Sequence, residues 1–349
     1  MVVIGYMGAV LWIGLRVMRR QTSADHYFTA DQRIPGWAAG VSMFATLLSS
    51  FTFIAFPGWT FDRDWQLLMR EAMAPLAVIF VAVLIIPIYR EAIKMSAYEY
   101  LEKRFGYVGR VYGTVGFLVG HLFKTGVVLF ALAVALETVI GTDKNIVILV
   151  LGLTALALTY VGGIEGVVWT EVVQGGLMLL SGLVIIAFLL TLTEVPGTAL
   201  LTAWEGGKFR VIDATPDLTR ETFWVFALFG AFHFLTRYAT DQTMVQRYLL
   251  APSVRQAVHG TLIGLACCMV AWIMFFLIGS LLWGFYQSEP ARLATSIVKG
   301  DQVLPYFIGR ELPVGLTGLV LAGLLASAQS TISGDLNCVG ACLTSDVFN

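Results

Sequence analysis

Hydroxyl side chains with helical spacing mark a candidate cation site near the end of the chain. Ser327, Ser330, Thr331 and Gly334 recur at i, i+3, i+4 and i+7, so they share one face of a helix. Hard cations prefer oxygen ligands, which hydroxyls and freed backbone carbonyls supply. Packing between membrane helices uses the same small residues. The pattern alone therefore leaves a sodium site and a helix-packing face as equal alternatives.

Four ionisable side chains lie within or beside apolar runs, where such groups are functional candidates. They are Glu71, Lys124, Glu171 and Arg237. No acidic residue lies within a helical turn of Lys124, so its countercharge must come from another segment, such as Glu71 or Glu171, or from a bound solute. For the two glutamates, a position near the membrane surface in contact with water is the alternative. A carboxylate on the solute is the functional alternative, and Arg237 at a polar interruption of its own span strengthens it, because Arg presents a planar fork to carboxylates.

The elements that position these residues must be membrane helices. The 349 residues are 58% apolar and 13% charged, with a mean hydropathy of +0.79, whereas soluble chains are about 45–50% apolar and about 25% charged. This composition excludes a soluble enzyme, a nucleic-acid-binding protein and a disordered scaffold. The net charge of −1 also gives no footprint for a polyanion.

Nine apolar runs approach or exceed the roughly 20 residues of a spanning helix. They cover residues 2–18, 37–60, 71–90, 111–140, 145–162, 166–192, 222–247, 258–286 and 312–345. Arg19 and Arg20 follow the first run as a stop-transfer pair, which predicts a retained helix and not a signal peptide. Residues 193–221 and 287–311 are predicted long loops. The distribution of Lys and Arg places the N-terminus outside the cytoplasm, and we expect a plasma or inner membrane.

Two of these spans contain polar stretches in the middle. Residues 45–52 (ATLLSSFT) interrupt span 37–60, and residues 236–242 (TRYATDQ) interrupt span 222–247. Backbone leaves the helix at this depth only where it lines a cavity, and paired interruptions indicate a transporter's binding site. The alternative is a Ser/Thr-rich helix interface in the first span and a helix end at Arg237 in the second.

Cysteine and histidine show no ligand spacing. The four cysteines lie in apolar runs, so we expect buried free thiols and neither disulfides nor zinc. No nucleophile–base pair is present, and the glycines at 162–166 are too short a run for a nucleotide loop. The sequence therefore predicts no enzyme and no organic cofactor.

Three stretches resemble the sodium/solute symporter family. Residues 240–249 (TDQTMVQRYL) resemble its D/N-Q-x-x-V-Q-R-x-L motif, and residues 162–174 (GGIEGVVWTEVVQ) resemble G-G-x-x-A-V-x-x-T-D-x-x-Q. Residues 330–337 (STISGDLN) resemble its hydroxyl-rich helix. The family transports sugars, proline, sialic acid, vitamins and monocarboxylates, and its LeuT-type fold has two inverted five-helix repeats. The resemblance covers nearly the whole chain and implies an all-α polytopic membrane protein.

The family pattern implies a division of the chain. Residues 2–18 would form an extra leading helix, 37–192 the first repeat, and 222–345 the first three helices of the second repeat. The second repeat would be incomplete, so we expect a C-terminally truncated reading frame or fragment.

The resemblance also implies sodium ligands. By position, Ala45 and Leu48 would supply backbone carbonyls, Ser327 a carbonyl, and Ser330 and Thr331 hydroxyls.

A second sodium, which some members bind, would use Ser330, Ser333, the next position and a carboxylate in span 166–192. Here these last two are Gly334 and Glu171, where the family has other residues, and both departures weigh against the second ion.

The implied substrate-binding residues are Ser49, Thr52, Glu71, Lys124 and Arg237. Lys124 aligns with a basic residue that holds the substrate carboxylate in sialic acid transporters, and Arg237 stands where sugar transporters have an aromatic gate. Glu71 matches a sugar-binding carboxylate.

Sugar transporters, however, carry amides at the positions of Leu47, Thr52 and Phe234, which disfavours a sugar here. The predicted function is therefore sodium-coupled uptake of a small organic anion, with the lipid bilayer and the solute as partners and no nucleic acid. A membrane-embedded solute sensor on the same fold, or a symporter of sugars or other neutral solutes, is the alternative. No oligomeric state is predicted.

Overall fold

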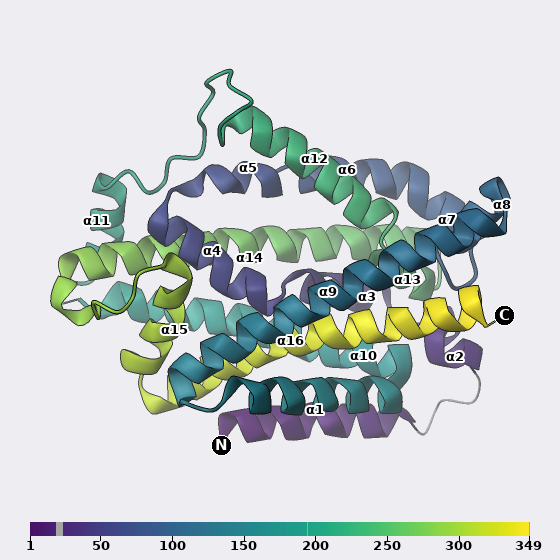
Figure 1. Cartoon of the computed structure of the whole chain (residues 1–349), viewed down its shortest axis with the longest axis horizontal. Coiled ribbons are helices and arrows are strands. Elements are labelled where there is room, and N and C mark those ends of the chain that lie inside the picture. The colour runs from purple at the N-terminus through teal and green to yellow at the C-terminus, as the bar shows by residue number, and fades with distance from the viewer. Residues whose placement is uncertain (19–23, 194, 349) are drawn as a thin grey trace.

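A computed structural model describes residues 1–18, 24–193 and 195–348, and these residues are almost entirely helical, without a strand. Long helices lie side by side along the longest axis of the molecule (Figure 1). The helical segments within the predicted spans are α1 (Val2–Met18), α3 (Gly36–Leu47), α4 (Ser50–Asp62), α6 (Ala74–Phe80), α7 (Ile86–Ala92), α9 (Tyr107–Ile140), α10 (Lys144–Thr191), α12 (Phe223–Ala239), α13 (Gln242–Leu250), α14 (Val254–Ser288) and α16 (Val314–Cys342). Further helices connect or extend them: α2 (Ala24–Thr29), α5 (Leu68–Glu71), α8 (Tyr98–Phe105), α11 (Thr198–Glu205) and α15 (Gly300–Arg310). The predicted stop-transfer pair, Arg19 and Arg20, lies outside the described residues.

Five helical segments of the described chain are long and apolar enough to cross a membrane, or six when the bent pair α3–α4 counts as one. The nine predicted spans differ from this number for three reasons. Helix α10 contains two predicted spans in its 48 residues, α1 has only 17 residues, and span 222–247 is divided between α12 and α13. Within α10, Gly163 leaves helical geometry (φ 53°, ψ −163°), which favours glycine at the predicted junction.

The two predicted long loops are partly helical, which corrects that prediction. Helix α11 lies in 193–221 and α15 in 287–311. Tertiary packing stabilises both: Gly284 of α14 lets the Ala199 carbonyl of α11 approach its backbone. At α15, the Gly300 amide donates to Asp62 Oδ2 (3.1 Å) at the end of α4. The hydropathy of the two segments themselves does not predict either contact.

Both predicted interruptions are confirmed as breaks. Helix α3 ends at Leu47, and α4 begins at Ser50, after two intervening residues and a bend of 60°. Ser49 caps α4, because its Oγ accepts a hydrogen bond from Thr52 N (3.3 Å). In the other span, Asp241 caps α13, because its Oδ1 accepts a hydrogen bond from Thr243 N (2.8 Å). Helix α12 therefore continues past Arg237 to Ala239 before the break.

Helix α16 is the buried centre of the bundle. Every residue from Val320 to Asp335 is buried, although this stretch contains several hydroxyls, an amide and a carboxylate. Polar groups without water are expensive unless they find partners inside the protein. The hydroxyl face of α16 is therefore held against the other helices.

Candidate functional site

The hydroxyl face of α16 meets the break between α3 and α4. Ser330 Oγ lies 2.9 Å from the Ala45 carbonyl oxygen and 3.1 Å from that of Ser327. Thr331 Oγ1 lies 3.0 Å from the Ser327 carbonyl and 3.4 Å from that of Thr46. All five residues are buried. Oxygen atoms from two separate segments thus converge, which is the chemistry that a sodium ion needs.

The break explains why backbone oxygens are available there. In a continuous helix the Ser49 amide would donate to the Ala45 carbonyl, but here it donates to Leu47 O (3.2 Å). Leu48 leaves helical geometry (φ −85°, ψ 84°) and is almost fully buried. The structure thus brings together the predicted residues Ala45, Leu48, Ser327, Ser330 and Thr331 in one region, and their role as sodium ligands stays a prediction.

A buried ion pair occupies the region predicted for a second sodium. Arg247 Nη2 lies 2.9 and 3.1 Å from the two carboxylate oxygens of Glu171, and neither side chain is exposed. Ser42 and Thr46 also donate to this carboxylate. A Cβ on Gly334 would lie 2.8 Å from Arg247 Nη2 and 3.0 Å from Glu171 Oε1, so glycine there leaves the volume for the guanidinium. Glu171 is therefore already neutralised by a cation of the protein.

The other residue of that prediction, Ser333, is buried on α16, where its carbonyl oxygen lies 3.4 Å from Thr159 Oγ1. Its part in a second sodium site also stays a prediction.

The countercharge of Lys124 comes from another segment, as one of the two alternatives had it, but the residue is Asp335 and neither Glu71 nor Glu171. Lys124 Nζ lies 2.9 Å from Asp335 Oδ1. Glu71 pairs instead with its neighbour Arg70, whose Nε lies 2.7 Å from Glu71 Oε1. The Lys124 pair joins α9 to α16, and no pattern within one helix could have indicated it. A carboxylate in the middle of span 312–345 was nevertheless a signal that sequence reasoning missed.

Lys124 and Asp335 belong to a larger group that we call the central charge cluster, with His121, Asp241 and Arg237. Arg237 forms an ion pair with Asp241, four residues later at the break. His121 of α9 lies between the two aspartates: its Nδ1 is 3.0 Å from Asp335 Oδ1 and its Nε2 is 3.3 Å from Asp241 Oδ2. The cluster thus connects α9, α16 and the break between α12 and α13.

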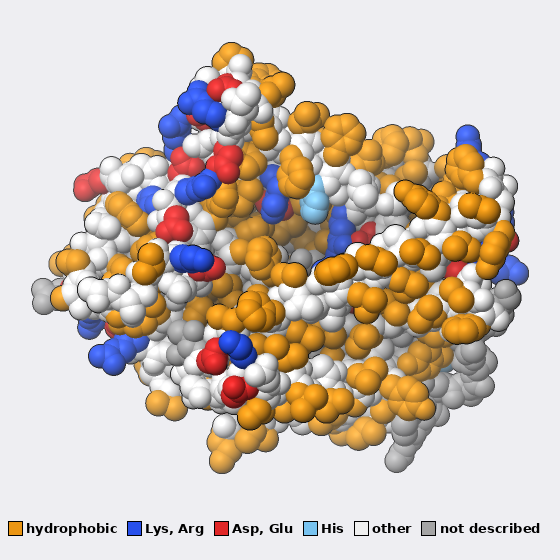
Figure 2. Space-filling model, viewed as in Figure 1, with side chains coloured by type: hydrophobic (Ala, Val, Ile, Leu, Met, Phe, Trp, Pro, Cys, Tyr) orange, Lys and Arg blue, Asp and Glu red, His pale blue; other side chains and the backbone are white. Residues whose placement is uncertain are grey.

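The cluster is partly accessible. The Lys124 side chain is 26% exposed and that of Arg237 15% exposed, whereas Asp335 is buried. Figure 2 shows a hollow in this face between α12 and α9, with basic side chains and a histidine at its wall. Ser50 Oγ donates to the Val128 carbonyl (3.0 Å), which puts the α3–α4 break beside α9, one helical turn from Lys124.

The five predicted substrate residues therefore lie at three places in the structure. Ser49 and Thr52 lie at the α3–α4 break, with their hydroxyls 3.3 Å apart, and Lys124 and Arg237 lie in the central charge cluster. Glu71 is 2% exposed and held by Arg70, so its carboxylate is not free for a sugar hydroxyl in this conformation. All five assignments stay predictions.

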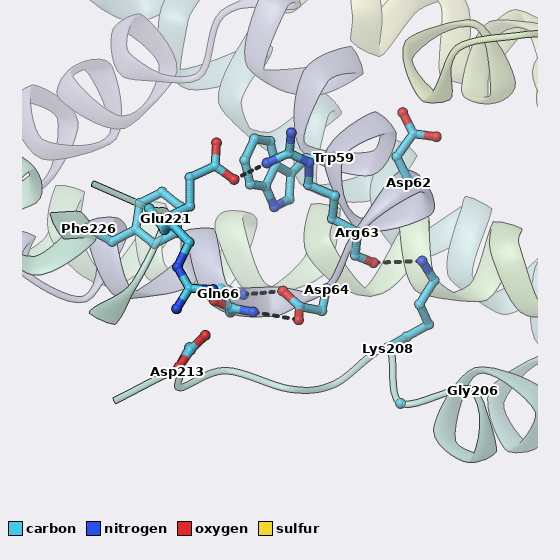
Figure 3. A pocket seen from close by; sticks show the side chains of 12 residues that line it. Trp59, Asp62, Arg63, Asp64, Gln66, Gly206, Lys208, Asp213, Glu221 and Phe226 are labelled. Atoms are coloured by element: carbon cyan, nitrogen blue, oxygen red, sulfur yellow. Dashed lines mark hydrogen bonds and ion pairs between the residues drawn. The ribbon is translucent and has the colours of Figure 1, made fainter. Parts of the chain in front are cut away.

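A separate polar pocket of about 490 Å³ lies where α4 ends and α12 begins (Figure 3). Lys208 Nζ donates to the carbonyls of Phe61 (2.7 Å) and Arg63 (2.6 Å) at the end of α4. Arg63 pairs with Glu221 and stacks over Trp59, 4.3 Å from the ring centroid. Burial lowers the pKa of Lys208 to about 8. This pocket shares no lining residue with the cation region or the central charge cluster.

Comparison with known proteins gives a consistent result. The model of the sodium:solute symporter family matches residues 27–349. The sodium/sialic acid symporter SiaT of Proteus mirabilis is 34% identical over 99% of this chain and 70% of its own length. The sodium/sialic acid symporter NanT of Aliivibrio fischeri is 33% identical over 98% of this chain and 68% of its own length. A solved structure of a Na+-coupled sialic acid symporter in a substrate-bound outward-open state superposes with a TM-score of 0.93 at 32% identity, covering 99% of this chain and 74% of that one.

Proposed function

This chain belongs to the sodium:solute symporter family, and we propose that its solute is a small carboxylate-bearing anion of the sialic acid class, taken up with sodium by alternating access. The observation that carries this proposal is the pair of partly exposed cations, Lys124 and Arg237, beside both helix breaks. An anion entering the hollow meets them where backbone is already free of helical hydrogen bonds. A solute carboxylate can accept charge-assisted hydrogen bonds from these cations beside their aspartate partners, whereas a neutral sugar has no charge to pair with them.

Sodium has a physical role in this arrangement. An ion among the oxygens of Ala45, Ser327 and Ser330 would hold the unwound segment against α16. The same segment continues into Ser49 and Thr52 on the solute side of the break. Sodium binding would thereby order the solute site before the solute arrives, which is positive coupling between two sites. Sodium moving down its gradient then drives uptake.

We infer the orientation of the chain in the membrane from its positive charges, and its division into repeats from the two helix breaks. Positive charge in the connections after the first, third and seventh predicted spans supports a cytoplasmic location of these connections, in a plasma or inner membrane. The two breaks support a first repeat over 37–192 and the first three helices of a second repeat over 222–345, after a leading helix 2–18.

Uptake into proteoliposomes tests the proposed function. With an inward sodium gradient, labelled N-acetylneuraminate should accumulate, and its methyl ester and glucose should not compete. A potassium gradient should give no accumulation. Accumulation of glucose in preference to the acid, or uptake that is equal in both salts, would overturn the proposal.

Lys124→Gln tests the carboxylate contact. The variant should bind N-acetylneuraminate at least tenfold more weakly, which is about 1.4 kcal/mol. Asp335 keeps His121 as a partner in this variant, and Lys124→Arg should restore binding if folding needs a cation here. Lys94→Gln, at an exposed lysine, is the matched control. Unchanged discrimination between the acid and its ester in Lys124→Gln would place the carboxylate elsewhere.

A further inference from the structure

His121 occupies a position that suits an imidazolium. Its two ring nitrogens face oxygens of two different carboxylates, Asp335 and Asp241, at 3.0 and 3.3 Å. A neutral imidazole carries one N–H donor and one lone pair, so one of its nitrogens would turn a lone pair toward a carboxylate oxygen. A protonated ring carries an N–H on each nitrogen and would present positive charge to both carboxylates at these ion-pair distances. The Phe117 ring packs against the imidazole, with centroids 4.1 Å apart and the ring planes tilted by 34°.

The charges around a protonated His121 add up to an excess of one positive charge, which one bound anion would balance. Lys124 on the same helix and Arg237 on α12 are balanced by Asp335 on α16 and Asp241 at the break. The imidazolium adds one positive charge to this otherwise neutral set. Other titratable groups of the described chain close to these aspartates are Tyr98 of α8, His233 of α12, Tyr248 of α13, and Cys338 and Cys342 of α16.

We propose that His121 is a proton-binding site coupled to the solute: the imidazolium supplies the positive charge that one solute carboxylate requires, so a proton and the anion bind together. The inference rests on the proposed function and adds the proton as a further bound species. With a neutral ring, the solute carboxylate would add a negative charge to a cluster whose own charges already cancel, because the sodium ion would lie at the α3–α4 break and not within the cluster. Because coupling between two ligands is reciprocal, protonation strengthens anion binding and the anion strengthens protonation.

Release of the solute would also favour release of the His121 proton. Both partners of His121 lie on segments at the site, since Asp241 caps α13 at the break and Asp335 follows Thr331 by one helical turn. When the solute leaves, the cluster carries an excess charge of one, and loss of the His121 proton to water restores neutrality. Sodium, proton and anion would then cross in one cycle.

Isothermal titration calorimetry of the detergent-purified protein with N-acetylneuraminate at saturating sodium tests this inference. Titrations at pH 7.5 in two buffers of different ionisation enthalpy should show net proton uptake, up to one per anion bound. Affinity should fall as the pH rises, approaching tenfold per pH unit in the alkaline range. The methyl ester should bind without proton uptake.

Two substitutions of His121 distinguish the effect of a positive charge at this position from the effect of proton uptake by the imidazole ring. His121→Gln keeps a hydrogen-bond donor but cannot take up the proton, so binding should be weaker and independent of pH. His121→Lys keeps a permanent charge, so binding should persist without proton uptake, and this variant decides the matter if the glutamine variant does not fold. His259→Gln, at an exposed histidine of α14, should behave as the wild type.

The outcomes distinguish the two proposals. Sodium-dependent binding with no proton uptake in the wild type overturns the role of His121 and leaves the proposed function standing. Proton uptake that survives in His121→Gln assigns the proton to another group and also overturns it. Absence of any sodium-dependent binding of the acid or of other organic anions contradicts the proposed function itself.

Discussion

At the scale of single residues, Thr331 is the most direct test of the cation region. Its hydroxyl lies within reach of two backbone carbonyls, those of Thr46 and Ser327, on the two segments that sodium would join. Thr331→Ala should raise the sodium concentration for half-maximal solute binding about fivefold, equivalent to about 1 kcal/mol for one lost oxygen ligand. The fold should survive, because Ala is a good helix former. Thr191→Ala, at an exposed threonine of α10, is the control, and equal sodium dependence in both variants would remove Thr331 from the site.

Lys208 makes a second residue-scale prediction, about pH. Because its pKa is about 8 in the folded protein and 10.5 ordinarily, the unfolded chain binds this proton more tightly. Between these two values the folded state therefore gains stability as the pH rises. The Tm difference between wild type and Lys208→Met should shift in favour of the wild type from pH 7 to pH 10.5. A difference that stays constant or moves the other way would show that Lys208 titrates normally.

At the scale of elements, glycines set the distance between α3 and α14. Gly36 and Gly40 of α3 face Gly260 and Gly264 of α14, and a Cβ on Gly264 would lie 2.6 Å from the Gly40 carbonyl oxygen. Small residues spaced by four allow such backbone contact between membrane helices. Helix α3, the first half of the broken span, is thereby held against the backbone of α14.

Gly40→Ala tests this contact. Its Cβ would overlap the Gly260 carbonyl, so the helices must separate, at a cost of about 1–3 kcal/mol. We expect a lower Tm and weaker sodium binding together, because α3 carries the Ala45 carbonyl. Gly152→Ala on α10, where a Cβ has open space, should not lower the Tm. An equal Tm for both variants would contradict close packing of α3 on α14.

At the scale of the whole molecule, the buried pair of Arg247 and Glu171 bears on ion stoichiometry. The carboxylate predicted to bind a second sodium is neutralised by the guanidinium, and Gly334, where the family has another residue, leaves the volume that this guanidinium fills. We therefore predict one sodium per solute. Parallel uptake of labelled sodium and labelled solute should give a ratio close to one and a Hill coefficient of one for sodium. A ratio of two would require the ion pair to open during transport.

Local properties of the sequence determined the class of the protein, both helix breaks and the hydroxyl face of α16. Hydropathy, helical periodicity and polar interruptions act over one or two turns, so they are visible in a single segment. The sequence predicted the connecting segments and the number of uninterrupted spans less accurately. Tertiary packing stabilises α11 and α15 in segments that were predicted as loops. In α10, two predicted spans form one helix with a bend at Gly163.

Only the tertiary structure decided how the charges are paired. Lys124 meets Asp335 across 211 residues of sequence, and Arg247 meets Glu171 across 76. His121, which had no pattern of its own, acquires a role because two helices bring carboxylates to both of its nitrogens. A buried charge takes whichever partner the packing of helices brings within a few ångströms, and that proximity is not encoded in the residues next to it.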